Sequence, residues 1–306
     1  LGLVGSEMCI RDRVIHNAEA VRVALERRLM GELAYAELRD KRDVRDGFEL
    51  DGSQARAVEA ALGLDDDELL LIVGPPGTGK TRVIAKIAYE LASRGERVLI
   101  SSHTNRAVDN AVELLPIDWT LRVGRPEKVM KHVKPYLLSY KVREKCGKEL
   151  MRIEEEMEKC LRWIKKLENE IKNVKSGYER EKLRGTLRLL KEQVKELFEE
   201  RGKLVRRAAE ELVNRVPIVG ATLIKSQLPP LDSCKFDTVI IDEASQASIT
   251  LALLAMVKAR KWVLVGDHKQ LQPIFRGLSV PECEELSAFT RLYRMYRSRS
   301  LWLRRH

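Results

Sequence analysis

Short apolar runs recur along much of the chain, and several of them are followed by a stretch with helical spacing. Runs of strand length occupy residues 69–73, 97–101, 216–220, 238–242 and 262–266. Alternation of strands and helices predicts an α/β fold, a mostly parallel sheet with helices on both faces. Because sheets of this kind bind ligands at the carboxyl ends of their strands, the residues after each run are the first candidates for chemistry.

A different pattern separates the second run from the third. Apolar residues are spaced alternately by four and three positions, which is a heptad seam, and after a break at Ser176 and Gly177 the pattern resumes as far as Ala208. It predicts two helices of about 30 residues that fold back on one another, each reaching about 45 Å. We therefore expect an antiparallel helical hairpin inserted at 125–214. The first arm of the seam is Cys146, Leu150, Ile153, Met157, Cys160, Ile164, Leu167, Ile171 and Val174.

The remaining segments complete the predicted domain organisation. Residues 14–46 have apolar positions three and four apart, as in an amphipathic helix that ends at Gly47. Residues 1–13 show no continuing periodicity and are expected to be a non-native, adapter-like leader. The sheet domain is then expected to comprise 47–124 and 215–306.

Composition narrows the class of protein. Apolar residues make up 44% and charged residues 33% of the 306, which is a globular composition. No apolar run approaches the roughly 18 to 20 residues that cross a bilayer, so no membrane span is expected. The five cysteines form no C-x-x-C pair, which argues against a disulfide framework or a zinc site. We expect an intracellular protein, in the cytoplasm or the nucleus.

The charge is unevenly distributed. The formal net charge is +10, and residues 125–214 hold 25 Lys and Arg against 17 Asp and Glu. The last sixteen residues add six arginines and no acidic residue. This distribution favours a polyanionic partner such as nucleic acid.

The strongest chemical signal is the segment GPPGTGKT at 74–81. It fits the phosphate-loop pattern G-x-x-x-x-G-K-[ST] and lies between an apolar strand and a helix. The backbone amides and the helix N-terminus can bind phosphates, Lys80 can reach the β and γ phosphates, and the Thr81 hydroxyl can ligate Mg²⁺. The predicted nucleotide-binding residues of this loop are Gly74, Gly77, Thr78, Gly79, Lys80 and Thr81.

Other candidates follow the remaining strands. Asp242 and Glu243 end the fourth run, where Asp242 can hold Mg²⁺ and Glu243 can act as the general base toward the attacking water. Gln270, in the loop after the fifth run, can contact the γ phosphate or that water. Gln54 precedes Gly74 by twenty residues, and its amide can pair with the N6 and N7 edge of adenine, which would select ATP over GTP.

Together these segments resemble motifs I, Ia, Ic, II and III of superfamily 1 helicases, in the subgroup of senataxin and the nonsense-mediated-decay helicase. The resemblance covers about 47–306, and Gln54 matches the adenine-reading position of that family. The matching segments are GPPGTGKT (74–81), SSHTNRAVDN (101–110), IVGATL (218–223), DEASQAS (242–248) and GDHKQLQP (266–273).

The resemblance implies an ATP-dependent translocase built from two RecA-like domains, with single-stranded DNA or RNA bound across them. Thr104, Asn105 and Thr222 would then touch the nucleic-acid backbone, and Gln270 would couple the γ phosphate to that track. The hairpin would be a prong near the nucleic acid, and residues 14–46 part of a stalk. Because motifs IV to VI are not found, we expect half of an ATP site, which needs a second RecA-like domain for full activity.

Two other classes stay open. Chromosome-maintenance ATPases also carry a coiled coil between the phosphate loop and the acidic motif, but they need an LSGG-type signature that this sequence does not contain. A nucleotide-switched regulatory module would leave GDHKQLQP unexplained. The sequence does not distinguish DNA from RNA, because backbone contacts and base stacking serve both.

Overall fold

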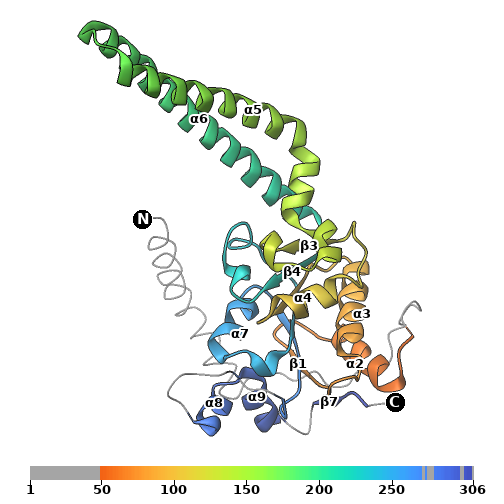
Figure 1. The fold of residues 1–306 in the computed structure, drawn as a ribbon. Coiled ribbons are helices and arrows are strands. Elements are labelled where there is room, and N and C mark those ends of the chain that lie inside the picture. Colours follow the sequence, from red (N-terminus) through yellow and green to blue (C-terminus); the bar gives the residue numbers. More distant parts are fainter. Residues whose placement is uncertain (1–48, 271–272, 274–278, 297–299, 305–306) are drawn as a thin grey trace. The chain divides into compact units, whose positions relative to one another are not determined.

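The computed structural model describes residues 49–270, 273, 279–296 and 300–304 (Figure 1). The predicted leader at 1–13 and the helix at 14–46 lie outside the described residues. The chain divides into two compact units, Leu137–Arg215 and the segments that flank it. The two units are considered separately below.

The flanking segments form one seven-stranded sheet in which every paired neighbour runs parallel, and this confirms the predicted α/β fold class. The strand order is β3-β4-β2-β5-β6-β1-β7. The strands are β1 (Leu69–Val73), β2 (Val98–Ser102), β3 (Thr120–Val123), β4 (Ile218–Thr222), β5 (Thr238–Asp242), β6 (Lys261–Gly266) and β7 (Leu301–Trp302).

Helices cover both faces of this sheet (Figure 1). One face carries α2 (Gly52–Leu62), α3 (Lys80–Ser93) and α4 (Asn105–Val112), and the other carries α7 (Ile249–Met256) and α9 (Ala288–Tyr296), with α8 (Val280–Glu285) packed on α9. Short 3-10 turns complete the unit at Pro126–Lys128, Lys131–Tyr136, Lys225–Gln227 and Ala244–Gln246.

The main core lies between the sheet and α2 and α3. Alternate residues of β1, Leu70 and Ile72, are buried there against α3 residues such as Val83 and Ile87. Burial of each such side chain contributes about 1.5–3 kcal/mol, and the resulting rigidity fixes where each strand ends. That end, the carboxyl edge of the sheet, is where the candidate residues gather.

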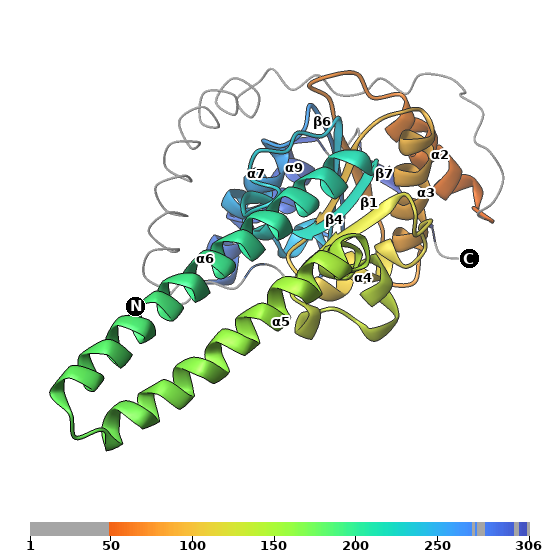
Figure 2. The same ribbon diagram turned by 90° about the horizontal axis from the view of Figure 1, so that it is seen from above.

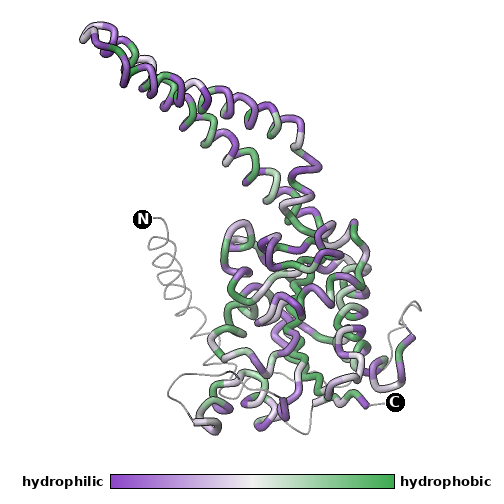
Figure 3. The backbone as a smooth tube through the Cα atoms, viewed as in Figure 1, coloured by the Kyte–Doolittle hydropathy of each residue, from purple (hydrophilic) through white to green (hydrophobic). Residues whose placement is uncertain are grey.

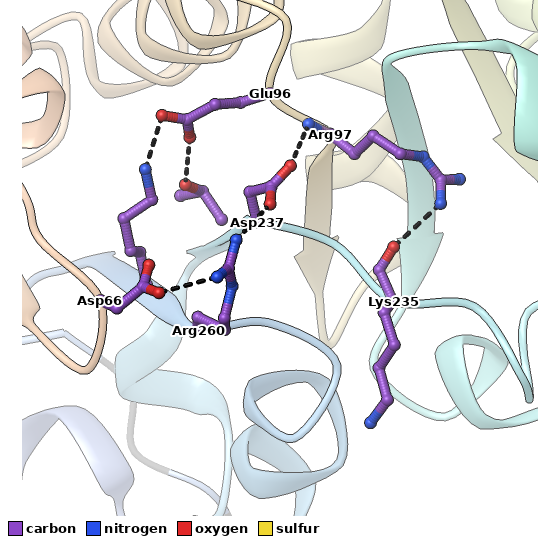
Figure 4. Close-up of polar contacts among 8 residues, drawn as sticks. Asp66, Glu96, Arg97, Lys235, Asp237 and Arg260 are labelled. Atoms are coloured by element: carbon purple, nitrogen blue, oxygen red, sulfur yellow. Dashed lines mark hydrogen bonds and ion pairs between the residues drawn. The ribbon is translucent and has the colours of Figure 1, made fainter.

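The opposite edge of the sheet, where the strands begin, is joined by ion pairs (Figure 4). Glu96, just before β2, pairs with Lys261 at the start of β6 with an N–O distance of 2.6 Å. Arg260 contacts both Asp237, at 2.9 Å, and Asp66, at 2.8 Å. The loops before β1, β2, β5 and β6 are therefore tied together.

The second unit consists of two long helices, α5 (Leu138–Asn173) and α6 (Gly177–Arg215), separated at the break predicted from Ser176 and Gly177 (Figure 2). Ion pairs show that the two helices are antiparallel, because residues later in α5 pair with residues earlier in α6. These pairs are Lys145 with Glu211, Glu154 with Arg201, and Glu168 with Lys191.

The hairpin has a narrow apolar seam and an extensive polar surface (Figure 3). Ile153, Met157 and Cys160 of the predicted seam are buried against Leu197. The seam is interrupted near its start, since Cys146 has non-helical backbone angles and kinks α5. The two helices thus pack through the predicted heptad positions, while most other positions are exposed.

Two features of the fold differ from the predictions. β3 and β7 were not predicted, because each is only four or two residues long and lacks a sustained apolar run. The insertion was expected to begin at residue 125, whereas α5 begins at Leu138, since residues 126–136 are largely taken up by 3-10 turns.

Candidate functional site

The phosphate loop connects β1 to α3 and depends on two left-handed glycines. Gly77 and Gly79 have φ values of +81° and +75°, a backbone region that favours glycine. At Gly79 a Cβ atom would also lie 2.5 Å from the Gln54 side-chain nitrogen. The Thr78 hydroxyl donates to the Pro75 carbonyl at 2.8 Å and closes the loop on itself. The loop is therefore preformed ahead of a helix N-terminus, which is an anion-binding geometry.

Lys80, the first residue of α3, folds back over this loop. Its Nζ donates to the carbonyls of Gly74 at 2.6 Å and Pro75 at 3.2 Å. Burial lowers the pKa of Lys80, and the carboxylates of Asp242, Asp267 and, least of the three, Glu243 oppose that shift. The ammonium group thus lies where negative charge from the ends of two strands, β5 and β6, converges. Thr81 follows it at the start of the helix and is half-buried.

Gln54 of α2 contacts the loop directly. Its Nε2 donates to the carbonyl of Thr78 at 3.1 Å, and its Oε1 accepts from the Asp51 amide at 3.1 Å in a capping box. The side chain is buried, and one N–H and one lone pair of its amide lie outside these two bonds. The structure therefore brings Gln54 to the phosphate loop across 24 positions of sequence.

Two adjacent carboxylates end β5. Asp242 is buried, and its Oδ1 accepts from the Glu243 amide at 2.8 Å. Burial raises the pKa of Asp242 to about 7, with the Glu243 amide and Lys80 opposing and the Glu243 charge adding to the shift. Glu243 has a positive φ of 50°, which is rare outside glycine, and its Oε2 accepts from the Thr104 hydroxyl at 3.3 Å.

The loop after β6 places Gln270 against a second buried carboxylate, that of Asp267. The Gln270 side chain donates to Asp267 Oδ2 at 3.1 Å, and its backbone amide donates to the Asp267 carbonyl at 3.0 Å. His268 stacks on Tyr293 of α9 with ring centroids 4.1 Å apart. This loop is therefore fixed from two sides, by its own turn and by α9.

The segment after β2 carries Thr104 and Asn105. Thr104 caps α4 by accepting from the Ala107 amide at 3.2 Å. Asn105 Oδ1 accepts from Arg122 at 2.9 Å, and Arg122 is itself a fully buried partner of Asp109, with an N–O distance of 2.6 Å. Asn105, one of the residues predicted to touch nucleic acid, is thus held in place by an ion pair that the sequence analysis did not single out.

The structure brings the predicted residues to the carboxyl edge of the sheet, but they are not all close to one another. Parallel register aligns Ser102 of β2 with both Asp242 and Thr222, so Thr222 ends β4 one strand away from β2 and two strands away from β5. No contact joins Thr222 to the phosphate loop among the described residues. Along the edge, the nucleic-acid candidates therefore follow β4 and β2, while the nucleotide candidates follow β5, β6 and β1.

Asp109, Arg122 and Asp267 are the residues of this edge that sequence analysis did not select. Asp267 stands within GDHKQLQP, so its position after an apolar run was a usable signal. Arg122 gave none, because a charged residue in a short strand is an ordinary surface residue in most proteins. Asp109 stands within SSHTNRAVDN, but its position in a helix gave no sign that it would be buried. Only the fold shows that both side chains are fully buried.

The residues present fit a magnesium ion. Mg²⁺ favours hard oxygen ligands and in nucleotide sites takes one or two protein groups together with phosphate oxygens. Asp242, with its raised pKa, is a buried carboxylate that a cation would keep ionised. No cluster of three or more His, Cys, Asp and Glu suited to a metal occurs among the described residues.

Within the described part of the chain, no helix combines the length and apolarity that crossing a membrane requires.

Comparison with known proteins identifies the family to which this chain is similar. The AAA domain family model matches residues 49–276. DNA polymerase alpha-associated DNA helicase A of Schizosaccharomyces pombe is 30% identical over 254 residues, which is 82% of this chain and 34% of the relative. An uncharacterized ATP-dependent helicase of Methanocaldococcus jannaschii is 32% identical over 275 residues, 81% of this chain and 41% of the relative.

The ATP-dependent helicase NAM7 of Saccharomyces cerevisiae is 34% identical over 232 residues, covering 74% of this chain and 20% of the relative. The chain therefore spans between a fifth and about two fifths of the length of these three relatives. The matched region includes β1 to β6 and every candidate residue described above. The chain belongs to the AAA domain family and carries the first RecA-like domain of a superfamily 1 helicase.

Proposed function

We propose that this chain is the ATP-binding half of an ATP-dependent helicase or translocase that moves on single-stranded DNA or RNA. The observation that carries the proposal is the carboxyl edge of the sheet. There the phosphate loop, the buried carboxylates of β5 and β6, and the segment with Thr104 and Asn105 lie at neighbouring strand ends. ATP hydrolysis and nucleic-acid binding can therefore influence one another over short distances.

In the nucleotide site, Gln54 reads adenine, and residues 74–81 bind the phosphates. Lys80 exchanges its bonds to the Gly74 and Pro75 carbonyls for oxygens of the β and γ phosphates, which suits a lysine that acts as a point charge. Thr81 and Asp242 would hold Mg²⁺, which when bound neutralises charge on the phosphates.

Hydrolysis breaks the bond between the γ phosphorus and the bridging oxygen, and water supplies the new P–O bond. Glu243 accepts the proton that this water loses, and the leaving ADP oxygen keeps the bonding electron pair. Gln270 is held by Asp267 at the same edge and senses the γ phosphate. Because the protein takes little part in the covalent chemistry, most of its rate enhancement comes from positioning the reactants and from electrostatic stabilisation.

The nucleic-acid strand lies across the ends of β2 and β4. Thr104, Asn105 and Thr222 contact its backbone rather than its bases, which is consistent with binding either DNA or RNA. The relatives named above are described as helicases, one of them as a DNA helicase, and this supports a nucleic-acid substrate.

Two substitutions test the nucleotide site. We expect Lys80→Ala to abolish binding of a fluorescent ATP analogue with Mg²⁺, because the β and γ phosphates lose their cation. Glu243→Gln should bind the analogue with affinity close to that of the natural chain but should hydrolyse ATP at least about 100-fold more slowly, as expected for loss of a general base. Equal loss of binding in both variants would remove Glu243 from the role of base. Turnover measured with single-stranded DNA and with single-stranded RNA then identifies the activating strand.

A further inference from the structure

Two large apolar side chains are exposed on one side of the helical hairpin. Leu161 of α5 and Phe198 of α6 have exposed fractions of 49% and 61%, and neither belongs to the buried seam. We propose that two copies of this chain associate through this side, called here the lateral face. The lateral face comprises Glu154, Leu161 and Glu168 of α5 and Lys191, Phe198 and Val205 of α6. The proposal concerns the hairpin and does not depend on the proposed function.

An ion pair between the two helices fixes the level of the exposed side chains. Glu168 pairs with Lys191 with an N–O distance of 2.8 Å. Seven residues are about two helical turns, and in antiparallel helices a step back along α5 matches a step forward along α6. Leu161 is seven residues before Glu168, and Phe198 is seven residues after Lys191. The two apolar side chains therefore lie at one level, on the same side of the hairpin as the ion pair.

The lateral face continues for one more step of seven residues. This step leads to Glu154, which pairs with Arg201 at 2.9 Å, and to Val205, which is half-buried. The apolar pair thus stands between two ion pairs, on a face that extends about 21 Å along α5. Single exposed apolar residues are ordinary, but two from different helices at one level form a patch rimmed by charge. A patch of this kind is typical of an interaction surface.

The charges of the lateral face are divided between the two helices. Its α5 side carries Glu154 and Glu168, whereas its α6 side carries Lys191, with Arg201 beside it. A second copy whose hairpin points the same way, related by a twofold axis along the hairpins, places its α6 on this α5. Each acidic side then meets a basic side, and Leu161 meets the phenyl ring of the second copy.

The same charges disfavour other occupants. If the second hairpin pointed the opposite way, α5 would lie on α5, and Glu168 would face Glu154 of the second copy as a like charge. A nucleic-acid strand would meet both glutamates as like charges. The parallel pair of hairpins instead buries the apolar patch in a four-helix arrangement and joins the two ion pairs of each copy to those of the other at its rim. A second copy is therefore the occupant that this face matches.

Sedimentation equilibrium of the 306-residue chain at several concentrations tests the proposal. The mass of the natural chain should rise from that of one copy, 35.0 kDa, toward twice that value as concentration increases. Phe198→Glu should shift association to concentrations at least about tenfold higher, because a charge replaces the apolar centre. Leu189→Glu is the matched control, since Leu189 is 68% exposed on the same helix but is two positions from Lys191 and so points to another side.

A mixture of two charge variants tests the orientation and the identity of the partner. Glu168→Lys alone and Lys191→Glu alone should each associate poorly with itself, because like charges then face one another between the copies. An equal mixture of the two variants should recover association, since opposite charges meet again at both contacts.

Three results would overturn the proposal. The first is a natural chain that keeps the mass of one copy at every concentration, or that associates only after single-stranded nucleic acid is added. The second is association that Leu189→Glu weakens as much as Phe198→Glu does. The third is a mixture of the two charge variants that associates no better than either variant alone.

Discussion

At the scale of single residues, a buried ion pair between Arg122 and Asp109 holds Asn105, one of the residues predicted to contact nucleic acid, in position. Arg122 is fully buried and bonds to Asp109, to the Val123 carbonyl and to Asn105, while Asp109 also accepts from the Met130 amide at 2.8 Å. Burial lowers the pKa of Arg122 and the charge of Asp109 opposes the change, so the guanidinium stays protonated. The pair fixes the position of Asn105 but leaves two charges inside the protein.

Removing one partner of this pair should therefore destabilise the folded chain. We expect Arg122→Met to lower the free energy of unfolding by about 3–5 kcal/mol, because Asp109 is left as a buried and uncompensated charge. Urea denaturation of each variant measures the loss. The double variant Arg122→Met with Asp109→Leu should recover a large part of it, since no isolated charge is left. If the free energy of unfolding of Arg122→Met were within about 1 kcal/mol of that of the natural chain, the pair would not be buried in solution.

Several residues of the candidate site could be identified from the sequence, but the contacts between them could not. The phosphate loop and Asp242 with Glu243 were selected because a local pattern of a strand followed by particular residues carries their chemistry. The contact between Thr104 and Glu243 was not predicted, because it joins positions 139 apart and depends on β2 lying beside β5. Local patterns identify groups, whereas strand order decides which groups meet.

At the scale of elements, the segments with a strong apolar periodicity were predicted from the sequence, whereas short segments without one were missed. Five strands and the two hairpin helices have sustained apolar patterns, and all of them are present. β7 has only two residues and is held by pairing with Ile72 and Val73 of β1. Its existence depends on a neighbour distant in sequence, so a local pattern had no means of showing it. β3 depends in the same way on β4.

The amino ends of the strands offer a test of electrostatic stabilisation. Burial tends to raise the pKa of Asp237, but hydrogen bonds from the Arg97 amide and Arg260 outweigh it and hold the pKa below its ordinary value of 3.8 (Figure 4). A depressed pKa contributes stability that is present above pH 3.8 and is lost as pH falls through the folded value.

Asp237→Asn should consequently unfold at a lower urea concentration than the natural chain at pH 7 and pH 5. The difference should narrow as pH falls below 3.8, where the natural carboxyl also becomes neutral. Urea midpoints over this pH range measure the effect. Asp66→Asn is a matched control, because Asp66 contacts Arg260 at the same edge but is more exposed. A difference that is constant with pH would mean that the charge of Asp237 is not its source.

The helical hairpin is the element whose role the sheet does not explain. The segment 125–214, which includes most of the hairpin, holds 25 basic and 17 acidic residues and so has an excess of positive charge. Hydrophilic residues predominate along both helices (Figure 3). A solvated helical pair also has mixed charges, so charge alone does not distinguish a spacer from a nucleic-acid contact. The two roles differ in their response to salt, because each phosphate that is neutralised releases counterions.

Replacing 146–212 with a short Gly/Ser linker keeps every strand of the sheet and removes most of the hairpin. If the hairpin contacts two or three phosphates, the slope of log K against log salt for a labelled single strand should become shallower by about 1.4–2.1, at roughly 0.7 for each contact. Fluorescence titration at several salt concentrations measures the slope. An unchanged slope and affinity would assign the hairpin to spacing or to protein contacts.

At the scale of the whole molecule, the candidate nucleotide-binding residues lie along one edge of one sheet. The sheet supplies the phosphate loop, the carboxylates and Gln270. The S. pombe and M. jannaschii relatives named above are two to three times longer than the matched region. The resemblance to superfamily 1 helicases implies that arginines of a second RecA-like domain complete the charge around the γ phosphate.

We therefore expect the 306-residue chain to bind ATP with Mg²⁺ and to hydrolyse it slowly. A protein that also includes the second RecA-like domain should hydrolyse ATP about 10³ to 10⁵-fold faster in the presence of single-stranded nucleic acid, which is the range that a transition-state arginine supplies. Steady-state phosphate release from both proteins measures the ratio, and Lys80→Ala in each gives the background. Turnover of several per second by the 306-residue chain alone would show that its own residues complete the site, and the requirement for a second domain would then be wrong.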